Sequence, residues 1–405
     1  MRYDVRIGGA AMAKKTVRDV DVAKRRLLVR VDFNVPMDRG GKITDDTRIR
    51  ACLPTIDYLV KQQARIVLCS HLDRPGGKMV DELRLAPTAK RLSELLNKLV
   101  QALNDCIGPQ VEAAVSGLRD GEIVLLENLR FYPQEEANDP QFAQSLSRLA
   151  DIYVDDAFGS CHRAHASIVG VAQYLPAVSG FLLQKELETL TGLVANPARP
   201  FGAVIGGAKL ATKLGLLNNM TTKVNSLLIG GGMAATFLKS QGYGVGNSAV
   251  EDSQIAGVLD VMKRAKSAGV ELVLPQDFIV AEKLEAGAAA QVVPMDKVPE
   301  DRIIADIGPK SVEAFSRVLD KCKTVFWNGP LGVFEIAEFA QATRDLAKVL
   351  ANLKATTIIG GGSTAEAVEE MGLTNRMSYV STGGGASLEL LQGKVLPGVA
   401  VLQDR

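Results

Sequence analysis

The sequence predicts an α/β protein with two domains, each built on a mostly parallel β-sheet that helices cover on both faces. One observation is length, because 405 residues exceed what one hydrophobic core ordinarily serves. A second is the alternation of short β-branched runs with helix-length patterns, which indicates repeated β-α-β units. A third is a helical stripe at 181–200, which separates two halves of different chemistry.

The predicted strands are runs of apolar residues, which fit strands buried on both faces of a sheet. In the first half they lie at 26–33, 65–70, 122–126 and 152–155. In the second half they lie at 203–205, 226–229, 271–274, 302–305, 324–327, 356–359 and 378–380. Helix-length patterns such as 87–100 and 340–353 lie between them. Ligands bind beyond the carboxyl ends of such strands, so the residues after each strand are the candidate site.

The middle of the chain carries the pattern of an amphipathic helix. Four apolar residues recur at spacings of four, three and four, on one helix face: Leu183, Leu187, Leu190 and Val194. Pro197 and Pro200 then end the helix, because proline lacks the amide hydrogen and disfavours a helical residue before it. We therefore expect a domain boundary here, at 181/182.

The composition describes a globular chain without a strong overall field. Hydrophobic residues make up 47% of the chain, charged residues 23%, and the formal net charge is +1. Such a balance gives no reason to expect nucleic-acid or membrane binding, so any anion site must be local. No apolar run approaches the roughly 18 residues of a membrane span. Residues 1–11 lack the apolar core of a signal peptide, and we interpret them as a disordered extension or an early start.

The five cysteines are scattered, and no pair has CxxC spacing. This pattern argues against a disulfide framework and against a structural zinc site. It fits a reducing cytosol, so we expect a cytoplasmic location.

Distinctive residues follow each predicted strand of the first half. These residues are Asp32, Phe33 and Asn34; His71, Leu72, Asp73 and Arg74; Arg130; and His162, Arg163 and His165. Arginine forms planar, bidentate pairs with phosphate or carboxylate, so several converging arginines suit a small substrate that carries both. Arg48, in a loop or at a helix start, could reach the same place. Taken alone, Asp32 and Asn34 fit an Asx-turn better than a ligand site. His162 and His165 have no third metal ligand nearby, which disfavours a metal site.

Glycine runs follow strands of the second half, and glycine lets backbone amides approach a phosphate. The runs lie at 206–207, 230–232, 360–362 and 383–385. Lys209 and Lys213 follow the first run, four residues apart, and a helix there would carry both on one face. The segment 202–209 misses the Walker A pattern by one residue, and 244–249 matches G-x-G-x-x-A without a preceding strand. Neither is an ordinary nucleotide fingerprint.

The run at 325–335 brings the only tryptophan, an amide and a carboxylate to a strand end. Asn328 and Glu335 could bind a ribose or the edge of a base. The alternative is purely structural, with Trp327 in the core and a turn after it.

Seven stretches together resemble the phosphoglycerate kinase family. They are RVDFNVP at 30–36, SHLDRP at 70–75, ENLR at 127–130, DAFG with HRAH at 156–165, GGAK with Lys213 at 206–213, WNGPLGVFE at 327–335 and STGGGAS at 381–387. The resemblance implies two Rossmann-like domains joined by a hinge helix, with the C-terminal tail returning to the first domain. The implied domains are 1–181 plus 389–405, for phosphoglycerate, and 182–388, for nucleotide.

The resemblance also implies an activity, the reversible transfer of a phosphoryl group between ATP and 3-phosphoglycerate, giving 1,3-bisphosphoglycerate and ADP in glycolysis or gluconeogenesis. It implies substrate-binding roles for Asp32, Phe33, Asn34, Arg48, His71, Leu72, Asp73, Arg74, Arg130 and Arg163. It implies nucleotide-binding roles for Gly206, Gly207, Lys209, Lys213, Gly230, Gly231, Asn328, Glu335, Gly361, Gly362, Ser363 and Thr364. Arg48, Lys209 and Lys213 would be catalytic. Mg²⁺ would be carried mainly by the nucleotide, near Ser363, in a monomer without nucleic-acid or membrane partners.

The residue chemistry agrees with that reaction. The attacking group is a carboxylate of the substrate that is already ionised, so neither a general base nor a protein nucleophile is needed. In-line positioning and positive charge on the transferring group are needed, together with closure that excludes water.

The chain departs from the family at Ser363, where an aspartate is usual, and at Asp73, where a glycine is usual. A hydroxyl is a weaker magnesium ligand than a carboxylate, so either water bridges the ion or Glu366 compensates. Asp73 would repel an anionic substrate unless its side chain points to solvent. One alternative is therefore a weakened or silent nucleotide-binding relative. A nicotinamide-dependent oxidoreductase is another, which the missing G-x-G-x-x-G after the first strand disfavours.

Overall fold

The computed structural model describes residues 13–38 and 40–405, so the interpretation of residues 1–11 lies outside the described residues. The chain divides into two compact units. Unit 1 comprises the described part of Met1–Thr191 together with Val395–Arg405, and unit 2 comprises Gly192–Lys394. The division thus falls at 191/192 and 394/395, where the sequence suggested 181/182 and 388/389. Most of the central helix accordingly counts with unit 1.

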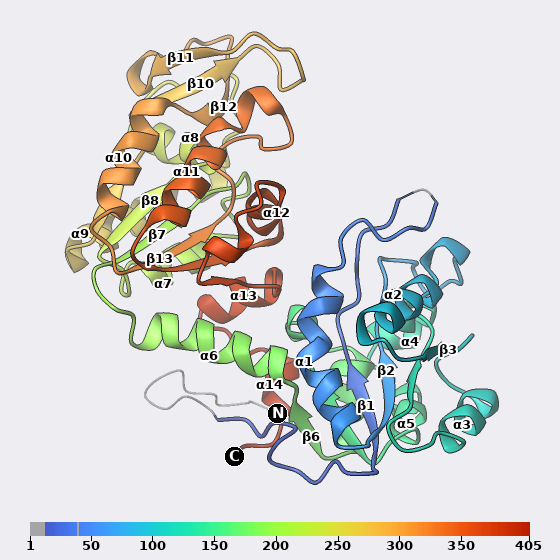
Figure 1. The fold of residues 1–405 in the computed structure, drawn as a ribbon. Helices are drawn as coiled ribbons and strands as arrows, with labels where there is room; N and C mark the ends of the chain where they lie inside the picture. Colours follow the sequence, from blue (N-terminus) through green and yellow to red (C-terminus); the bar gives the residue numbers. More distant parts are fainter. Residues whose placement is uncertain (1–12, 39) are drawn as a thin grey trace. The chain divides into compact units, whose positions relative to one another are not determined.

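Unit 1 contains, in its described part, a six-stranded sheet with strand order β3-β4-β2-β1-β5-β6 (Figure 1). The strands are β1 (Arg26–Arg30), β2 (Arg65–Cys69), β3 (Val100–Ala102), β4 (Ile123–Leu125), β5 (Ile152–Asp155) and β6 (Ala177–Ser179). All neighbouring pairs are parallel, and Arg30 at the end of β1 pairs with Cys69 and Asp155 at the ends of β2 and β5. The segments that follow these strands therefore all begin on one side of the sheet, at the carboxyl ends of the strands.

The helices of unit 1 alternate with its strands. They are α1 (Thr47–Lys61), α2 (Ala86–Leu96), α3 (Pro109–Ser116), α4 (Pro133–Glu136), α5 (Pro140–Ser147) and α14 (Pro397–Ala400). Single turns are η1 (Asp81–Leu83), η2 (Leu129–Phe131), η3 (Phe158–Ser160), η4 (Ala166–Gly170) and η5 (Val171–Gln173). The predicted helix at 87–100 is too long, because Asn97 takes a left-handed conformation with φ of 48° and Val100 begins β3.

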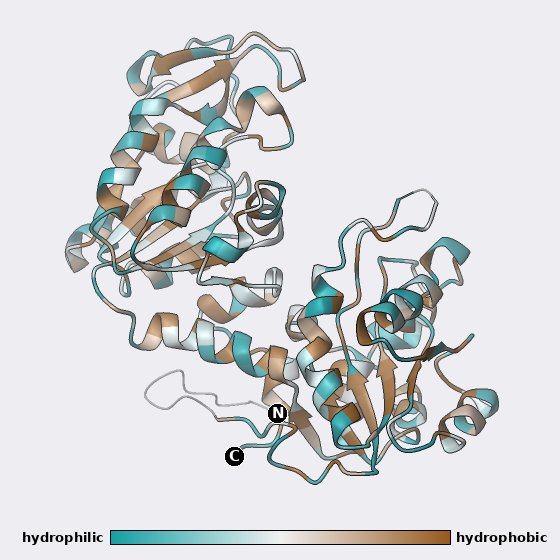
Figure 2. Cartoon of the chain, in the orientation of Figure 1, coloured by the Kyte–Doolittle hydropathy of each residue, from teal (hydrophilic) through white to brown (hydrophobic). Residues whose placement is uncertain are grey.

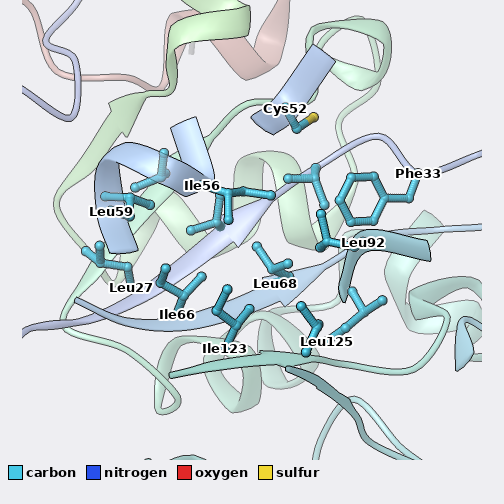
Figure 3. Packing of buried hydrophobic residues seen from close by; sticks show 14 of the residues in the cluster. Leu27, Phe33, Cys52, Ile56, Leu59, Ile66, Leu68, Leu92, Ile123 and Leu125 are labelled. Carbon is cyan, nitrogen blue, oxygen red and sulfur yellow. The ribbon is translucent and has the colours of Figure 1, made fainter. Parts of the chain in front are cut away.

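Apolar side chains of strands and helices form the core of unit 1. Figure 3 shows Leu27, Ile66 and Leu68 of the sheet against Ile56 and Leu59 of α1. All five are fully buried. Figure 2 shows hydrophobic strands inside the units and hydrophilic residues on the helices around them. Burial on both faces explains why the strands are continuous apolar runs.

Unit 2 contains a second six-stranded parallel sheet, with strand order β15-β14-β13-β7-β8-β9. Its strands are β7 (Phe201–Ile205), β8 (Ser226–Ile229), β9 (Glu271–Val273), β13 (Thr324–Asn328), β14 (Thr356–Gly360) and β15 (Tyr379–Val380). Its helices are α7 (Leu214–Met220), α8 (Met233–Ser240), α9 (Ile255–Ala268), α10 (Pro309–Leu319), α11 (Gln341–Asn352), α12 (Gly362–Glu370) and α13 (Gly385–Leu391). Single turns are η6 (Asp252–Gln254), η7 (Met295–Lys297), η8 (Ala337–Phe339) and η9 (Thr374–Arg376).

Unit 2 also has a small antiparallel sheet that the sequence did not predict. Its order is β11-β10-β12, with β10 (Asp277–Ala281), β11 (Gln291–Pro294) and β12 (Ile303–Ile307). The run at 302–305 was expected in the parallel sheet and pairs with β10 instead.

The central helix α6 spans Phe181–Ala195 and ends before the two prolines that were expected to stop it. Its start is fixed from within unit 1. Asp156 Oδ1 accepts hydrogen bonds from the amides of Leu182 and Leu183, at 2.9 and 3.2 Å, and Thr55 Oγ1 accepts from the amide of Phe181 at 2.9 Å. These acceptors satisfy amides that a helix start leaves unpaired.

The C-terminal segment belongs to unit 1 by its contacts. The amide of Gln403 donates to the carbonyl of Ala177 in β6 at 3.0 Å. Lys14 Nζ donates to the carbonyl of Leu402 and to Asp404, at 2.9 and 2.7 Å. The two ends of the described chain thus pack beside the edge strand of the same sheet.

Candidate functional site

The segments after β1 and β2 are joined to each other in unit 1. Asn34 Oδ1 accepts from the amide of Asp73 at 2.8 Å, and Asp32 Oδ2 pairs with Arg48 Nη1 at 2.8 Å. Asp32 Oδ1 also accepts from the amide of Asn34 at 3.2 Å, which is the predicted Asx-turn. Arg48 is the second residue of α1. The structure therefore brings Asp32, Asn34 and Arg48 together. Asp32 forms the Asx-turn and takes part in this group at the same time.

His71 is a buried, neutral imidazole with a defined tautomer. Burial lowers its pKa well below the ordinary value, and the charge of Arg30 lowers it further. Arg30 Nη2 lies 3.0 Å from His71 Nδ1. Because a guanidinium only donates, Nδ1 must accept and the hydrogen resides on Nε2. His71 can therefore donate one hydrogen bond to a ligand.

Arg130 lies in a crowded group of cations. Its Nη1 donates to the carbonyl of Asp73 at 2.7 Å, and its Nε lies 3.2 Å from Glu136 Oε1. Burial lowers the pKa of Arg130, and the charges of Arg30 and Arg163 lower it against the opposing field of Glu136. An anion bound among these side chains would relieve their mutual repulsion.

The same cations act on His165. Burial lowers its pKa to about 4, with further lowering from Arg130, Arg30 and Arg163. His165 Nδ1 is 3.9 Å from a carboxylate oxygen of the buried Glu135. His165 is therefore neutral near pH 7 and adds no charge to the group.

Asp32 stays ionised although it is almost completely buried. Burial raises the pKa of this carboxyl, but the positive charges of Arg48 and Arg30 outweigh that effect and leave the pKa below the ordinary value. Its negative charge holds Arg48 in place at the sheet edge.

The predicted site residues of unit 1 differ in how far their side chains are exposed. Phe33 and Leu72 are buried in the hydrophobic core, so their side chains support the loops rather than point outward. Arg74 is exposed and Arg163 half-buried. Asp73 has an exposed side chain and a φ of 53°, a conformation that favours glycine. Its backbone bonds to Asn34 and Arg130 hold that conformation, and its carboxylate points to solvent.

Sequence reasoning missed four residues that hold the loops at the strand ends of unit 1, namely Asn128, Arg30, Ser167 and Glu135. Asn128 is fully buried and makes four hydrogen bonds, to the amides of Leu72 and Arg130 and to the carbonyls of Leu72 and Leu83. Arg30 donates to Ser167 Oγ at 2.9 Å, and Ser167 in turn donates to Glu135 at 2.6 Å. An arginine that ends a buried apolar strand was the available signal for Arg30.

In unit 2 the loops after β7, β8 and β13 pack backbone against backbone. A Cβ at Gly231 would lie 2.3 Å from the amide nitrogen of Gly207, and one at Gly329 would lie 2.3 Å from the carbonyl oxygen of Gly206. Both residues have positive φ, of 69° and 97°. These glycines are therefore required by the fold itself, whatever ligand the loops bind. Gly362, by contrast, is exposed and has open space at its Cβ position.

The expectation that Lys209 and Lys213 share a helix face is wrong. Residues 208–213 form an irregular loop, and α7 begins only at Leu214, with Lys213 as its N-cap. The amides of Leu210 and Ala211 bond to the carboxylate of Glu251. Side-chain acceptance of these amides replaces the helical pairing that the spacing suggested. Lys209 is exposed and Lys213 half-buried.

Lys213 reaches the end of β13. Its Nζ donates to Asn328 Oδ1, and burial lowers the pKa of this ammonium group to about 8. Asn328 is fully buried, and its Nδ2 has no hydrogen-bond partner among the described residues. A buried donor without a partner is costly, so a ligand that accepts from it would be favoured.

The remaining predicted residues lie at the same edge of the sheet of unit 2. Trp327 is fully buried and its Nε1 donates to the carbonyl of Gly329 at 2.8 Å, which confirms the structural alternative for this side chain. Thr364 Oγ1 is buried and accepts from the amide of Gly329 at 2.7 Å. Ser363 is exposed in the first turn of α12, and Glu335 is exposed in the loop after β13.

Two parallel-sheet units, one with a cation group at its strand ends and the other with glycine loops and a half-buried lysine, define a two-domain α/β enzyme of the phosphotransferase class. The sequence model of phosphoglycerate kinase matches residues 17–394. The chain therefore belongs to the phosphoglycerate kinase family. Its activity is that of a kinase that transfers a phosphoryl group to a carboxyl group of 3-phosphoglycerate, as the resemblance implied.

Individual relatives agree with this membership. The phosphoglycerate kinase of Moorella thermoacetica is 52% identical over 394 residues, covering 97% of this chain and 100% of the relative. That of Dictyoglomus turgidum is 51% identical over 398 residues, with the same coverage of 97% and 100%. These relatives give no support to a weakened nucleotide-binding protein.

Solved structures show the same architecture. The phosphoglycerate kinase of Coxiella burnetii matches with a TM-score of 0.85 and 42% identity, over 96% of this chain and 98% of that one. The enzyme of Pyrococcus horikoshii matches with a TM-score of 0.83 and 31% identity, over 96% and 98% of the two chains. The predicted fold of two parallel-sheet α/β domains is thereby confirmed. No helix in the described part of the chain is long and apolar enough to cross a membrane.

Proposed function

We propose that unit 1 binds 3-phosphoglycerate or 1,3-bisphosphoglycerate and that unit 2 binds ATP or ADP. The observation that carries this assignment is the group formed by Arg30, Arg130 and Arg163, in which burial lowers the pKa of Arg130 and the charges of Arg30 and Arg163 lower it further. Such a group suits a small ligand with a phosphate and a carboxylate, since both are anions that arginine binds bidentately.

In unit 1 the ligand contacts divide between side chains and backbone. The residues proposed to hold the substrate are Asp32, Phe33, Asn34, Arg48, His71, Leu72, Asp73, Arg74, Arg130 and Arg163. His71 would donate from Nε2, and Asp32 and Asn34 would accept from a hydroxyl group of the ligand. Phe33, Leu72 and Asp73 would act through the backbone, because two of their side chains are buried and the third points to solvent.

In unit 2 the proposed nucleotide-binding residues are Gly206, Gly207, Lys209, Lys213, Gly230, Gly231, Asn328, Glu335, Gly361, Gly362, Ser363 and Thr364. The Nδ2 of Asn328, for which the described part of the chain offers no hydrogen-bond partner, supports a phosphate nearby. The exposed start of α12 offers amides and a helix dipole to a second phosphate. The hydroxyl of Thr364 is already bonded to Gly329, so we assign it the support of this loop.

Catalysis would rest on positioned positive charge. The substrate carboxylate attacks without a general base, and Arg48, Lys209 and Lys213 are the proposed catalytic residues that stabilise charge on the transferring group. Arg48 is already oriented by Asp32, and Lys213 by Asn328. Transfer between ligands on different units also requires the units to close around them and exclude water.

Magnesium would be bound mainly through the nucleotide. The described residues contain no group of three or more His, Cys, Asp or Glu that could hold a metal ion. Mg²⁺ commonly keeps several waters and is bound through substrate phosphates, so the site fits an ion that arrives with ATP. When bound it would neutralise phosphate charge, with the exposed Ser363 reaching it directly or through water.

The cellular setting is also a proposal. All five cysteines are free and buried, which fits a reducing cytoplasm. We propose that the enzyme works there as a monomer, without nucleic-acid or membrane partners, in line with its net charge of +1. Light scattering after size exclusion, at micromolar protein, would show a mass near 43.2 kDa.

A coupled assay tests the function. Purified protein is mixed with ATP, magnesium and 3-phosphoglycerate, and the product is consumed by an NADH-dependent dehydrogenase. We expect turnover that requires all three components. No turnover above the blank would refute the proposal.

A further inference from the structure

We propose that Glu251 is a positioning residue that holds the loop carrying Lys209 and Lys213 in its working shape. This loop, residues 208–213, is called the lysine loop below. The inference rests on the proposed roles of the two lysines. Glu251 precedes η6 and lies outside every stretch that carries the family resemblance.

The contact is a bidentate one between a side chain and the backbone. Glu251 Oε1 accepts from the amide of Leu210 at 2.5 Å, and Oε2 accepts from the amide of Ala211 at 3.1 Å. Two oxygens on two successive amides fix both the position and the direction of the peptide between them. Without the carboxylate these amides would have no helical partner, because α7 begins only at Leu214.

Leu210 transmits this restraint to Lys213. The side chain of Leu210 is fully buried, and its carbonyl accepts from the amides of Lys213 and Leu214, at 2.8 and 3.0 Å. One residue thus joins the core, the Glu251 carboxylate and the turn that carries Lys213. A shift of the Leu210 peptide would move the ammonium group away from Asn328.

Glu251 is itself held by the neighbouring helix α8. Its amide donates at 3.2 Å to Oγ1 of Thr236, which is buried. On the other side of the loop, Gln392 Nε2 donates to the carbonyl of Thr212 at 3.1 Å. The lysine loop is therefore restrained from two sides, and Glu251 supplies the only charged contact to its backbone among the described residues.

The adjacent residue offers a matched control. Asp252 is exposed and pairs with Lys239 at 2.9 Å, away from the lysine loop. Asp252→Asn removes the same charge one position along the chain. Surface pairs of this kind contribute little to stability. Its kcat and KM values should equal those of the unmodified enzyme.

Two variants of Glu251 separate positioning from general damage. Glu251→Ala should lower kcat by about 10- to 100-fold, because a small misplacement of a catalytic group has effects of this size. The KM for 3-phosphoglycerate should stay within about 2-fold, since unit 1 is untouched. Glu251→Gln should fall between, because its one carbonyl oxygen can accept from only one of the two amides.

Amide hydrogen exchange gives a readout independent of activity. The amides of Leu210 and Ala211 should exchange faster in Glu251→Ala, and those of the β7 strand should not. A general loss of structure would instead speed exchange across unit 2 and raise both KM values. An unchanged kcat in Glu251→Ala, or uniformly faster exchange, would overturn the inference.

A parallel variant keeps this test separate from the proposed roles of the lysines. If Lys213→Ala retains its kcat, the role of the lysine loop itself is wrong. If Lys213→Ala loses activity while Glu251→Ala keeps it, only the inference about Glu251 fails.

Discussion

The cations at the strand ends of unit 1 differ in how much of their binding capacity the fold already uses. The guanidinium of Arg30 already donates to the carbonyl of Val31, to Ser167 and to His71. Arg48 has one ion pair, to Asp32, and a side chain that is 36% exposed. Arg30 is therefore a residue that orients others, and Arg48 is available to a substrate.

Replacing Arg48 should affect rate much more than stability. We expect Arg48→Ala to lower kcat by about 100- to 1,000-fold, in line with removal of a preorganised donor. The free energy of unfolding should fall by about 1 to 3 kcal/mol, because the almost completely buried Asp32 loses its ion-pair partner, and the protein should remain folded. Arg48→Lys should be intermediate, because it keeps the charge and loses the planar fork.

Arg50 is the matched control for this substitution. It lies on the same helix, is exposed, and pairs with Asp46 at 2.7 Å. Arg50→Ala should have normal kcat in the coupled assay. Near-normal turnover in Arg48→Ala would show that Arg48 has no catalytic role.

Lys213 should give the reaction an alkaline limit. Burial lowers its pKa to about 8, so the ammonium group loses its charge as pH rises through 8. The kcat/KM for the nucleotide, which reports the free enzyme, should therefore fall between pH 7.5 and 9.5. Lys213→Arg should remove this limit, because arginine stays charged. A flat profile in the unmodified enzyme would contradict the assignment.

At this scale, residue types were predictable and their surroundings were not. The arginines and Lys213 were found because their chemistry is distinctive in the chain. The helical placement of Lys209 and Lys213 failed, because a distant carboxylate, Glu251, takes the amides that would start that helix. Asp73 could not be resolved from sequence, since only its backbone conformation shows where its side chain points.

Among the elements, α6 begins on a buried acid. Burial raises the pKa of Asp156 to about 7. Hydrogen bonds from Thr55 and from the amides of Leu183 and Leu182 lower this pKa, but burial outweighs them. The second carboxylate oxygen of Asp156 has no hydrogen-bond partner among the described residues. The folded chain therefore favours the protonated form of Asp156 at the start of α6.

This predicts a pH-dependent cost that an amide would remove. The unfolded chain ionises Asp156 near pH 3.8 and the folded chain only near 7, so the folded state loses stability as pH rises between these values. Asp156→Asn should gain stability over the unmodified chain across that window, with a slope of at most about 1.4 kcal/mol per pH unit. Urea unfolding at pH 4, 5.5 and 8 measures it. An equal difference at all three values would disprove the linkage.

The parallel sheets were predictable because strands buried on both faces are continuous apolar runs. The strands β3, β6 and β11 were not predicted, whereas β4, β9 and β15, which are just as short, were predicted. β11 has three exposed residues of four, and β3 and β6 have only three residues each. Their pairing partners, not their own sequences, make them strands.

For the whole molecule, the sequence separated two kinds of chemistry, and the structure places each on its own unit. Side-chain cations gather at the strand ends of unit 1, and close-packed glycine loops with a half-buried lysine gather at those of unit 2. The tail could be assigned to the first domain only through the family resemblance, since its place depends on contacts such as that between Gln403 and Ala177. No local pattern encodes such distant pairing.

Calorimetric titration of two variants tests this division most directly. Arg163→Ala should weaken 3-phosphoglycerate binding by about 10- to 100-fold, the range of a lost charge-assisted hydrogen bond, and leave MgADP binding unchanged. Lys213→Ala should do the reverse. If either variant weakens both ligands equally, or if the two effects are exchanged, the assignment of one ligand to each unit is wrong.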